Sequence, residues 1–399
     1  MRGVVGRSQC EALLEGTDVF FNRSIDGGTT WSNGDVRLDT DSPGADFSFG
    51  PVLEVEGSSV YVAWTDGRAD GPFSTEHSDI YFNRSLDGGA TWLASDVRVN
   101  TGTAASESAG SHQLAAVGSD VYAVWADARL GFIYFNRSQD GGATWGTQEL
   151  RLDVAGKADS PAIAATDDAV YVAWMANNGP CSRCRVTLFT RSLDGGVSWS
   201  PPMYLDVGTY DPPEIAVNGD AVFVLWGGRD VTFMRSFDRG ATWLASPTRL
   251  RNPMQPGGSS GPVLAAEGST VFAAWLDNRD GTWHIYGNVP FGTQPYGAGI
   301  PGAGGLVPRL EAQGFAALGQ TVTFTLDRFV GSAPAALLIG GPGSRTQVPI
   351  FGGTLLVAPT LALPVVLGGT PGAPGAGSAT FALPIVDDAS LLASSTSKC

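Results

Sequence analysis

Short runs of alternating apolar and polar residues fill the first 290 positions of the chain, and they recur in a fixed order. Each unit begins with two runs, the second of which ends in Trp, as in residues 51–64. A third run that ends in Arg-Ser follows, as in residues 79–85, and then a shorter fourth run, as in residues 96–100. Alternation with a period of two is typical of β-strands that bury one face. The pattern therefore predicts repeated units of four antiparallel strands and an all-β fold.

A segment close to Ser-x-Asp-x-Gly-x-Thr-Trp follows the third strand of these units, and we call it the box. Its five copies, boxes 1 to 5, are residues 24–31, 85–92, 138–145, 192–199 and 236–243. Their first residues are 61, 53, 54 and 44 positions apart, which is the spacing of propeller blades. Because one small four-stranded sheet cannot bury both of its faces alone, we expect the units to stack as a propeller.

The box has the composition of a tight turn. Its Asp accepts hydrogen bonds from backbone N–H groups, and the Gly two residues later supplies a positive φ without a Cβ clash. Its Trp offers a large ring that packs on adjoining strands. We therefore expect structural roles for the box residues Asp26, Trp31, Asp87, Trp92, Asp140, Trp145, Asp194, Trp199, Asp238 and Trp243.

The repeated box resembles the Asp-box (BNR) repeat of sialidases and related propellers, over about residues 19–289. The resemblance implies a sialidase-like β-propeller, and we expect six blades, with five and seven as the alternatives. Boxes of this kind also occur in other glycosidases and in non-catalytic binding propellers. The resemblance is therefore specific for the fold and much less so for an activity.

The two ends of the repeat region differ from the complete units. The first unit has one strand-like run on each side of its box, so two strands are predicted to be missing, and residues 1–16 read as neither a strand pair nor a signal peptide. The last unit, residues 262–289, has three strands and no box. Because a closed ring removes sheet edges, either the N-terminal strands complete the last blade or upstream sequence is lost. We favour loss, and expect an extracellular or cell-surface protein whose signal peptide belonged to the lost segment.

The charge of the chain narrows its partners. The formal net charge is -15, and residues 291–399 carry equal numbers of acids and bases, so the excess belongs to the repeat region. Such a surface repels a phosphate backbone, which excludes nucleic acid as the expected partner. No run of 18 uncharged apolar residues predicts a membrane span. We expect a monomer that recognises a glycan or a glycoprotein.

The candidate site lies on the face opposite the boxes, which the loops after the second and fourth strands build. Three of these loops carry Trp-x-Asp-x-Arg, with Arg68, Arg129 and Arg279 as the arginines. Arginine pairs with carboxylates through two parallel hydrogen bonds. The sialidase resemblance implies that such a cluster holds the substrate carboxylate. It also implies a Tyr nucleophile assisted by a Glu, for which Tyr210 and Glu214 are candidates.

The same resemblance implies an Asp acid/base, for which Asp70 or Asp46 is the candidate. A structural interpretation competes with the catalytic one, because the arginines recur at one repeat position. Each would then bind its own Asp two residues earlier, and Tyr210 and Glu214 would be structural or exposed. Two functions remain open: a secreted exo-α-sialidase or related glycoside hydrolase, and a non-catalytic propeller that binds a glycan or protein at the loop face.

Cysteines and clustered acids suggest smaller features. Cys181 and Cys184 occupy one loop, and a disulfide between them is the simplest expectation for an extracellular chain. A zinc site there would need two further ligands in a chain with three His, so we expect no metal. Ca²⁺ bound by loop carboxylates is the alternative, and its candidate ligands are Asp41, Asp46, Asp66, Asp70 and Asp79.

The C-terminal quarter has a different composition. A Gly- and Pro-rich segment, residues 291–308, is predicted to link the propeller (residues 1–290) to a separate module. Four strand-like runs follow, at residues 321–326, 335–340, 353–359 and 379–385. They predict a small β-sandwich over residues 309–399.

Overall fold

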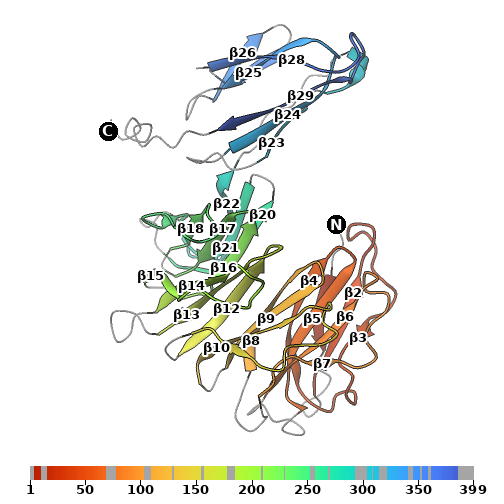
Figure 1. Ribbon diagram of the computed structural model, residues 1–399, viewed down its shortest axis with the longest axis vertical. Coiled ribbons are helices and arrows are strands. Elements are labelled where there is room, and N and C mark those ends of the chain that lie inside the picture. The colour runs from red at the N-terminus through yellow and green to blue at the C-terminus, as the bar shows by residue number, and fades with distance from the viewer. Residues whose placement is uncertain are drawn as a thin grey trace. The chain divides into compact units, whose positions relative to one another are not determined.

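The computed structural model of the chain describes residues 4–9, 16–68, 78–102, 109–127, 130–153, 157–177, 185–207, 210–228, 230–251, 257–267, 270–292, 303–307, 309–313, 321–339, 345–350, 353–357 and 361–384. These residues form β-strands and connecting turns, with one short 3-10 helix, η2 (Ala303–Gly305) (Figure 1). The strands fall into two compact units. One contains residues 1–265 and 273–288, and the other contains residues 266–272 and 289–399.

Six antiparallel sheets follow one another from the N-terminus. Sheet 1 contains β1 (Val4–Gln9), β2 (Asp18–Arg23) and β3 (Val36–Arg37). Sheet 2 contains β4 (Ser48–Glu56), β5 (Ser59–Asp66), β6 (Asp79–Ser85) and β7 (Val97–Arg98). Sheet 3 contains β8 (Ala109–Val117), β9 (Asp120–Asp127), β10 (Phe132–Ser138) and β11 (Leu150–Arg151).

The remaining sheets repeat this order of strands. Sheet 4 contains β12 (Ala158–Ala165), β13 (Val170–Ala176), β14 (Val186–Ser192) and β15 (Met203–Val207). Sheet 5 contains β16 (Glu214–Asn218), β17 (Ala221–Trp226), β18 (Thr232–Ser236) and β19 (Thr248–Arg249). Sheet 6 contains β20 (Ser259–Glu267), β21 (Thr270–Asp277) and β22 (His284–Gly292). The sheets are the six blades of a β-propeller, which confirms the fold class predicted from the boxes.

The start of the chain differs from the prediction. Residues 4–9 form β1, which pairs with β2 over the full register from Val4 opposite Arg23 to Gln9 opposite Asp18. In the described residues sheet 1 therefore has three strands, one more than predicted, and the prediction of two missing strands was wrong. The run has only two consecutive apolar residues and no alternation, so the pattern gave no signal. The free edge of β2 supplies the hydrogen-bond partners instead.

Among the described residues, the hydrophobic core forms layers between sheets, and four of them each join two neighbouring blades. The layer between sheets 1 and 2 contains Phe21 and Trp64, and the layer between sheets 3 and 4 contains Phe135 and Trp174, all of them buried. Because each strand alternates, one face of a sheet packs against the preceding sheet and the other against the next. The blades are thus stabilised mainly by contact with their neighbours.

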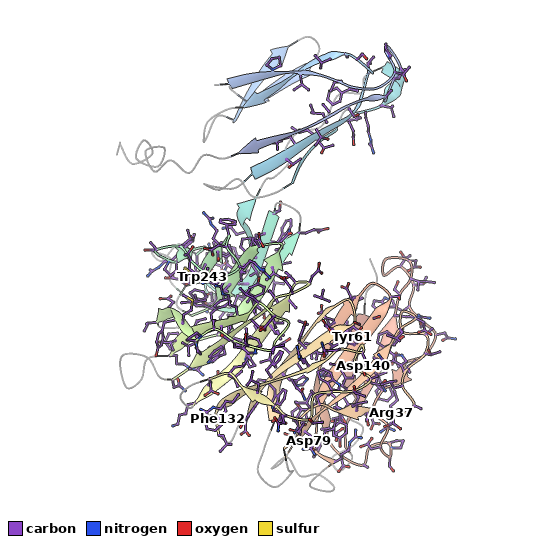
Figure 2. The ribbon with its side chains drawn as sticks, viewed as in Figure 1. Arg37, Tyr61, Asp79, Phe132, Asp140 and Trp243 are labelled. Atoms are coloured by element: carbon purple, nitrogen blue, oxygen red, sulfur yellow. The ribbon has the colours of Figure 1, made fainter. Side chains whose placement is uncertain are left out.

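The same side-chain contact recurs at each of these four interfaces. The box Trp meets a Phe on the third strand of the preceding sheet edge to face, with ring centroids 4.7 to 5.2 Å apart. The pairs are Phe21–Trp92, Phe82–Trp145, Phe135–Trp199 and Phe189–Trp243, of which Trp243 is labelled in Figure 2. The box Trp therefore packs on the neighbouring blade.

A glycine and an arginine complete each contact. A Cβ on Gly196 of box 4 would lie 2.6 Å from the Phe135 ring, so the ring occupies the space that a side chain would need. Arg137, which follows β10's Phe135 by two residues, donates from Nη1 to the carbonyl oxygen of Gly195 at 2.7 Å. Equivalent bonds run from Arg23, Arg84 and Arg191 to the boxes of the next sheets.

Within each box the predicted turn is present. In box 3, Ser138 Oγ donates to Asp140 and accepts from the N–H of Gly142 at 2.8 Å. Asp140 in turn accepts from the backbone and the hydroxyl of Thr144, at 2.8 and 2.6 Å. The same bonds occur in the other boxes. In box 1, hydrogen bonds from Thr30 lower the pKa of Asp26 to about 2.

The C-terminal unit contains more strands than predicted. The four expected runs are β24 (Thr321–Phe329), β25 (Pro334–Ile339), β27 (Gly353–Val357) and β29 (Gly377–Pro384). Three further strands were missed: β23 (Arg309–Gln313), β26 (Arg345–Ile350) and β28 (Leu361–Val366). They pair as β23-β24-β29, β25-β28 and β26-β27. The β-sandwich stays a prediction, and η2 interrupts the segment predicted as a linker.

Gly196→Ala should destabilise the protein by about 1–3 kcal/mol more than Gly28→Ala, because only the first forces a Cβ into a neighbouring ring. The two glycines have nearly the same φ, 85° and 89°, so the strain of a left-handed Ala is matched. Among the described residues, a Cβ on Gly28 would meet nothing within 4 Å. The free energy of unfolding of both variants is measured by urea denaturation. Equal losses of unfolding free energy would show that the boxes do not hold the blades together.

Candidate functional site

The loop face lies at the ends of strands opposite the boxes. In sheet 2 the start of β4 pairs with the end of β5, with Ser48 opposite Asp66, and the end of β5 pairs with the start of β6. The loops after the second strand and before the first strand therefore share one edge, while the box lies at the other. The same register in sheets 3 and 4 gives all complete blades this polarity.

The first predicted arginine is bound within its own blade. Asp66 is buried and accepts hydrogen bonds from Ser48 Oγ at 2.9 Å and Trp64 Nε1 at 3.1 Å. Arg68 adds two side-chain bonds to Asp66, at 2.8 and 2.6 Å, and two to Asp96, at 3.1 and 3.0 Å. Its guanidinium also stacks 3.8 Å from the centre of the Tyr81 ring. The donors of Arg68 that would grip a substrate carboxylate thus face these two aspartates.

The arginine of sheet 6 is bound in the same way. Arg279 Nη2 donates to Asp277 at 2.5 Å, and Arg251 Nε donates to the same carboxylate at 3.0 Å. Burial opposes ionisation of Asp277, but the hydrogen bonds from Arg279 outweigh it and lower its pKa to about 2. The Arg279 guanidinium lies 4.0 Å from the centre of the Tyr286 ring. Arg129, the third arginine, lies outside the described residues.

The described candidates for the catalytic residues border different cavities or none. Tyr210 is 62% exposed and lines one cavity, whereas Glu214 lines another. Asp46 is partly buried, and burial together with the nearby Asp66 raises its pKa. Asp70 lies outside the described residues, as do Cys181 and Cys184.

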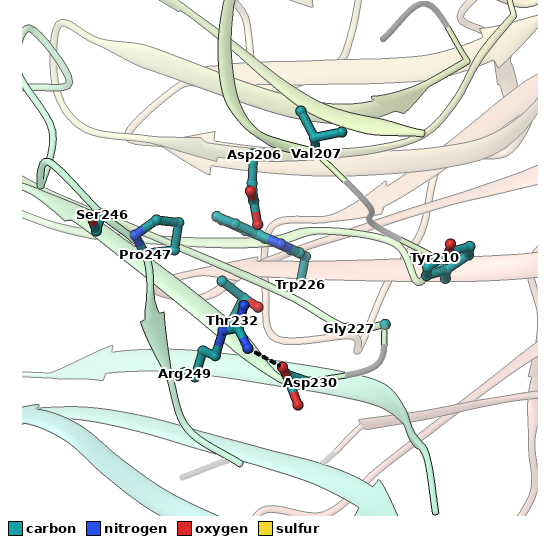
Figure 3. Close-up of a pocket in the computed structure, with 11 residues that line it drawn as sticks. Asp206, Val207, Tyr210, Trp226, Gly227, Asp230, Thr232, Ser246, Pro247 and Arg249 are labelled. Carbon is teal, nitrogen blue, oxygen red and sulfur yellow. Dashed lines mark ion pairs between the residues drawn. The ribbon is translucent and has the colours of Figure 1, made fainter. Parts of the chain in front are cut away.

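The cavity that Tyr210 lines has a volume of about 670 Å³ and lies between sheets 4 and 5; we call it the outer cavity (Figure 3). Asp206 and Val207 border it from β15, and Trp226 from the end of β17. Asp230 and Arg249 form an ion pair there, with a 3.0 Å separation between nitrogen and oxygen. The sequence analysis did not select Asp206, Asp230 or Arg249. The signal for two of them is the repeat, because an Asp at the start of the third strand pairs with the Arg of the fourth strand in sheets 1 and 2 as well, as Asp18–Arg37 and Asp79–Arg98.

A second cavity, of about 230 Å³, lies where the first strands of sheets 3, 4 and 5 converge; we call it the inner cavity. Its lining residues are Ser111, Gln113, Ser160, Pro161, Ala162, Ile163, Pro212, Pro213, Glu214 and Ile215. Burial raises the pKa of Glu214 to about 7. Among the described residues, Glu214 supplies the only carboxyl group in the lining of the inner cavity. It stands at the end of β16 that is nearest the loop face.

The candidate calcium ligands are largely held by arginines. Asp41, with Asp18 and Asp39, surrounds Arg37, whose Nη2 lies 2.5 to 3.0 Å from an oxygen of each. Asp79 pairs with Arg98 at 2.7 Å. A carboxylate already neutralised by a guanidinium has less to offer a cation. These contacts favour a structural role for the acids. Across the described residues, no helix has the length and apolar character needed to cross a bilayer.

Comparisons with known proteins found similarity to solved structures. No protein-family model matches the chain, and no curated protein matches it in sequence. Among solved structures, a Hadza microbial sialidase is 15% identical, with a TM-score of 0.40 over 79% of this chain and 71% of that one. A Penicillium chrysogenum α-L-arabinanase complexed with arabinobiose is 14% identical, with a TM-score of 0.45 over 69% and 86%. A Trypanosoma rangeli sialidase is 12% identical, with a TM-score of 0.44 over 96% and 81%. At such identities and TM-scores, the substrates of these enzymes carry no argument for this chain.

Arg68→Ala should lower the free energy of unfolding by about 3–5 kcal/mol, because it leaves the buried Asp66 without its counter-charge. Arg185→Ala is a matched control, since Arg185 pairs with Asp159, whose side chain is 39% exposed, and should cost about 1 kcal/mol or less. Denaturant unfolding of both variants measures the difference. A folded Arg68→Ala protein with unchanged stability would mean that Arg68 is not needed for the blade and is available to a ligand.

Proposed function

We propose that the protein is an extracellular propeller that binds a neutral glycan in the outer cavity. The observation that carries this proposal is the lining of that cavity. The exposed ring of Tyr210 offers a flat apolar surface, while Asp206, Asp230 and Arg249 offer planar hydrogen-bonding groups. An aromatic surface beside a few convergent polar groups is the usual composition of a small-molecule site. Its volume of about 670 Å³ suits an oligosaccharide of a few units.

The charges around the outer cavity favour a neutral ligand over a sialoside. Its lining contains two carboxylates and one guanidinium, and that guanidinium already pairs with Asp230. The whole chain carries a formal net charge of -15, so it does not attract an anionic substrate at long range. Arg68 and Arg279, the described members of the predicted carboxylate clamp, are each bound to an aspartate. These observations support recognition of uncharged sugars and weigh against an exo-α-sialidase.

Tyr210→Ala should weaken binding of neutral oligosaccharides at least tenfold, because the stacking surface is lost, while Tyr210→Phe should retain it. Tyr204→Ala is the control, since Tyr204 is 56% exposed on neighbouring β15 but does not line the cavity. A glycan array identifies the ligand, and isothermal titration calorimetry then measures affinity. Binding that Tyr210→Ala leaves unchanged would contradict the proposal.

Turnover assays separate the two functions that the sequence left open. Incubation with fluorogenic sialosides and with neutral glycosides should release no product if the cavity serves only for binding. Release from a neutral glycoside that Asp206→Asn abolishes would make the protein a glycoside hydrolase at the same site. Release from a sialoside would contradict the assignment of a neutral ligand.

A further inference from the structure

Glu214 breaks the symmetry of the repeat at the inner cavity. It is the first residue of β16 and pairs with Leu225, the residue before the strand Trp. The equivalent positions are Gln113 in sheet 3, opposite Val124, and Ala162 in sheet 4, opposite Ala173. An acid therefore stands where the other blades have neutral residues. The packing of the blades does not require a charge at this position.

The carboxyl of Glu214 has no partner among the described residues. No hydrogen bond or ion pair satisfies it there, and burial alone raises its pKa. The inner cavity is lined otherwise by hydroxyls, one amide, prolines and aliphatic side chains. The described lining residues include no cation, so a positively charged ligand would give the partly buried carboxylate of Glu214 a counter-charge that the protein does not supply there.

Charged groups on the surrounding segments do not neutralise Glu214. On β12, Asp159 is paired with Arg185 at 2.7 Å, and β13 and β17 contain no charged residue. On β8, the buried His112 is hydrogen-bonded to Thr65 and to the carbonyl of Ala63, and burial lowers its pKa to about 4. Asp211, just before β16, is a second acid whose pKa burial raises.

The serines of the inner cavity occupy costly backbone positions. Bulges interrupt the pairing of β8 and β12, and they place Ser111 at a φ of 45° and Ser160 at 52°. The corresponding bulge in sheet 2 has Gly50, at a φ of 63°. A non-glycine residue in this region costs about 1–3 kcal/mol. Sheets 3 and 4 thus have hydroxyl groups against the cavity at positions where glycine would be less strained.

We propose that the inner cavity binds one amino sugar unit through its protonated primary amine, with Glu214 as the counter-ion and Ser111, Ser160 and Gln113 as hydrogen-bond partners of the sugar hydroxyls. The volume of about 230 Å³ lies below the range of roughly 300–1,000 Å³ usual for larger ligands, so it suits a single ring. A divalent metal ion fits poorly, because calcium and magnesium sites draw on several carboxylates and the lining has one. The inner cavity shares no lining residue with the outer cavity, so the inference does not rest on the proposed function.

Glucosamine, glucose and N-acetylglucosamine serve as probes, with the full-length protein titrated calorimetrically between pH 6 and 7. Glucosamine should bind at least tenfold more tightly than the other two, and Glu214→Gln should abolish this preference. Because a cationic ligand favours the carboxylate, binding should also release protons, which titrations in buffers of different ionisation enthalpy detect. Tyr210→Ala should leave glucosamine binding unchanged, which separates this site from the outer cavity.

The stability of Glu214→Gln provides the folding control. An acid whose folded pKa is raised destabilises the protein progressively as the pH rises from its unfolded value of about 4.5 to its folded value of about 7. The Gln variant should therefore be at least as stable as the parent at pH 8. Equal affinity for glucosamine and N-acetylglucosamine, an undiminished preference in the folded Glu214→Gln variant, or no glucosamine binding would each overturn the proposal.

Discussion

The propeller depends on one repeated contact, in which a Phe ring of one blade lies against the Gly and the Trp of the next box. A small four-stranded sheet cannot bury both faces alone, so its stability comes from its neighbours. Box glycines have no side chain, which allows the ring to approach within the space a Cβ would fill. An Arg two residues after the Phe then donates to the carbonyls of the same box, as Arg84 does to Asp140 and Gly141. Apolar packing and hydrogen bonding therefore act on the same small segment.

The boxes and the two cavities lie at different ends of the strands. Contacts between blades occur at both ends, since Arg251 of sheet 5 also bonds to Asp277 of sheet 6 on the loop side. The Trp-x-Asp-x-Arg motif adds a second fixed element beneath the loops, because Asp66 and Asp277 each collect bonds from a Trp and an Arg. Residues outside these motifs, such as Tyr210 and Glu214, are free to differ from blade to blade. Such residues line both cavities, together with repeat residues such as Trp226 in the outer cavity.

The sequence predicts those parts of the fold that repeat. The box, its spacing and the strand Trp positions are sufficient to predict the blades, because identical turns and core residues recur. By contrast, β1 has a weak pattern and becomes a strand by pairing with the free edge of β2. The Asp230–Arg249 ion pair follows the repeat, as Asp79–Arg98 does in sheet 2, but nothing local in the sequence indicates that Asp206 of sheet 4 lines the same cavity. Tyr210 and Glu214 stand four residues apart in the sequence but line different cavities, which the sequence pattern does not indicate.

A double-mutant cycle on Phe135 and Trp199 tests most directly whether the Phe–Trp contact holds the blades together. Phe135→Leu, Trp199→Leu and the double variant are unfolded in urea, and the coupling energy is taken from the four free energies of unfolding. An edge-to-face contact at 4.9 Å predicts a coupling of about 0.5–1.5 kcal/mol. A coupling indistinguishable from zero would contradict it and would mean that the blades are held together by other contacts.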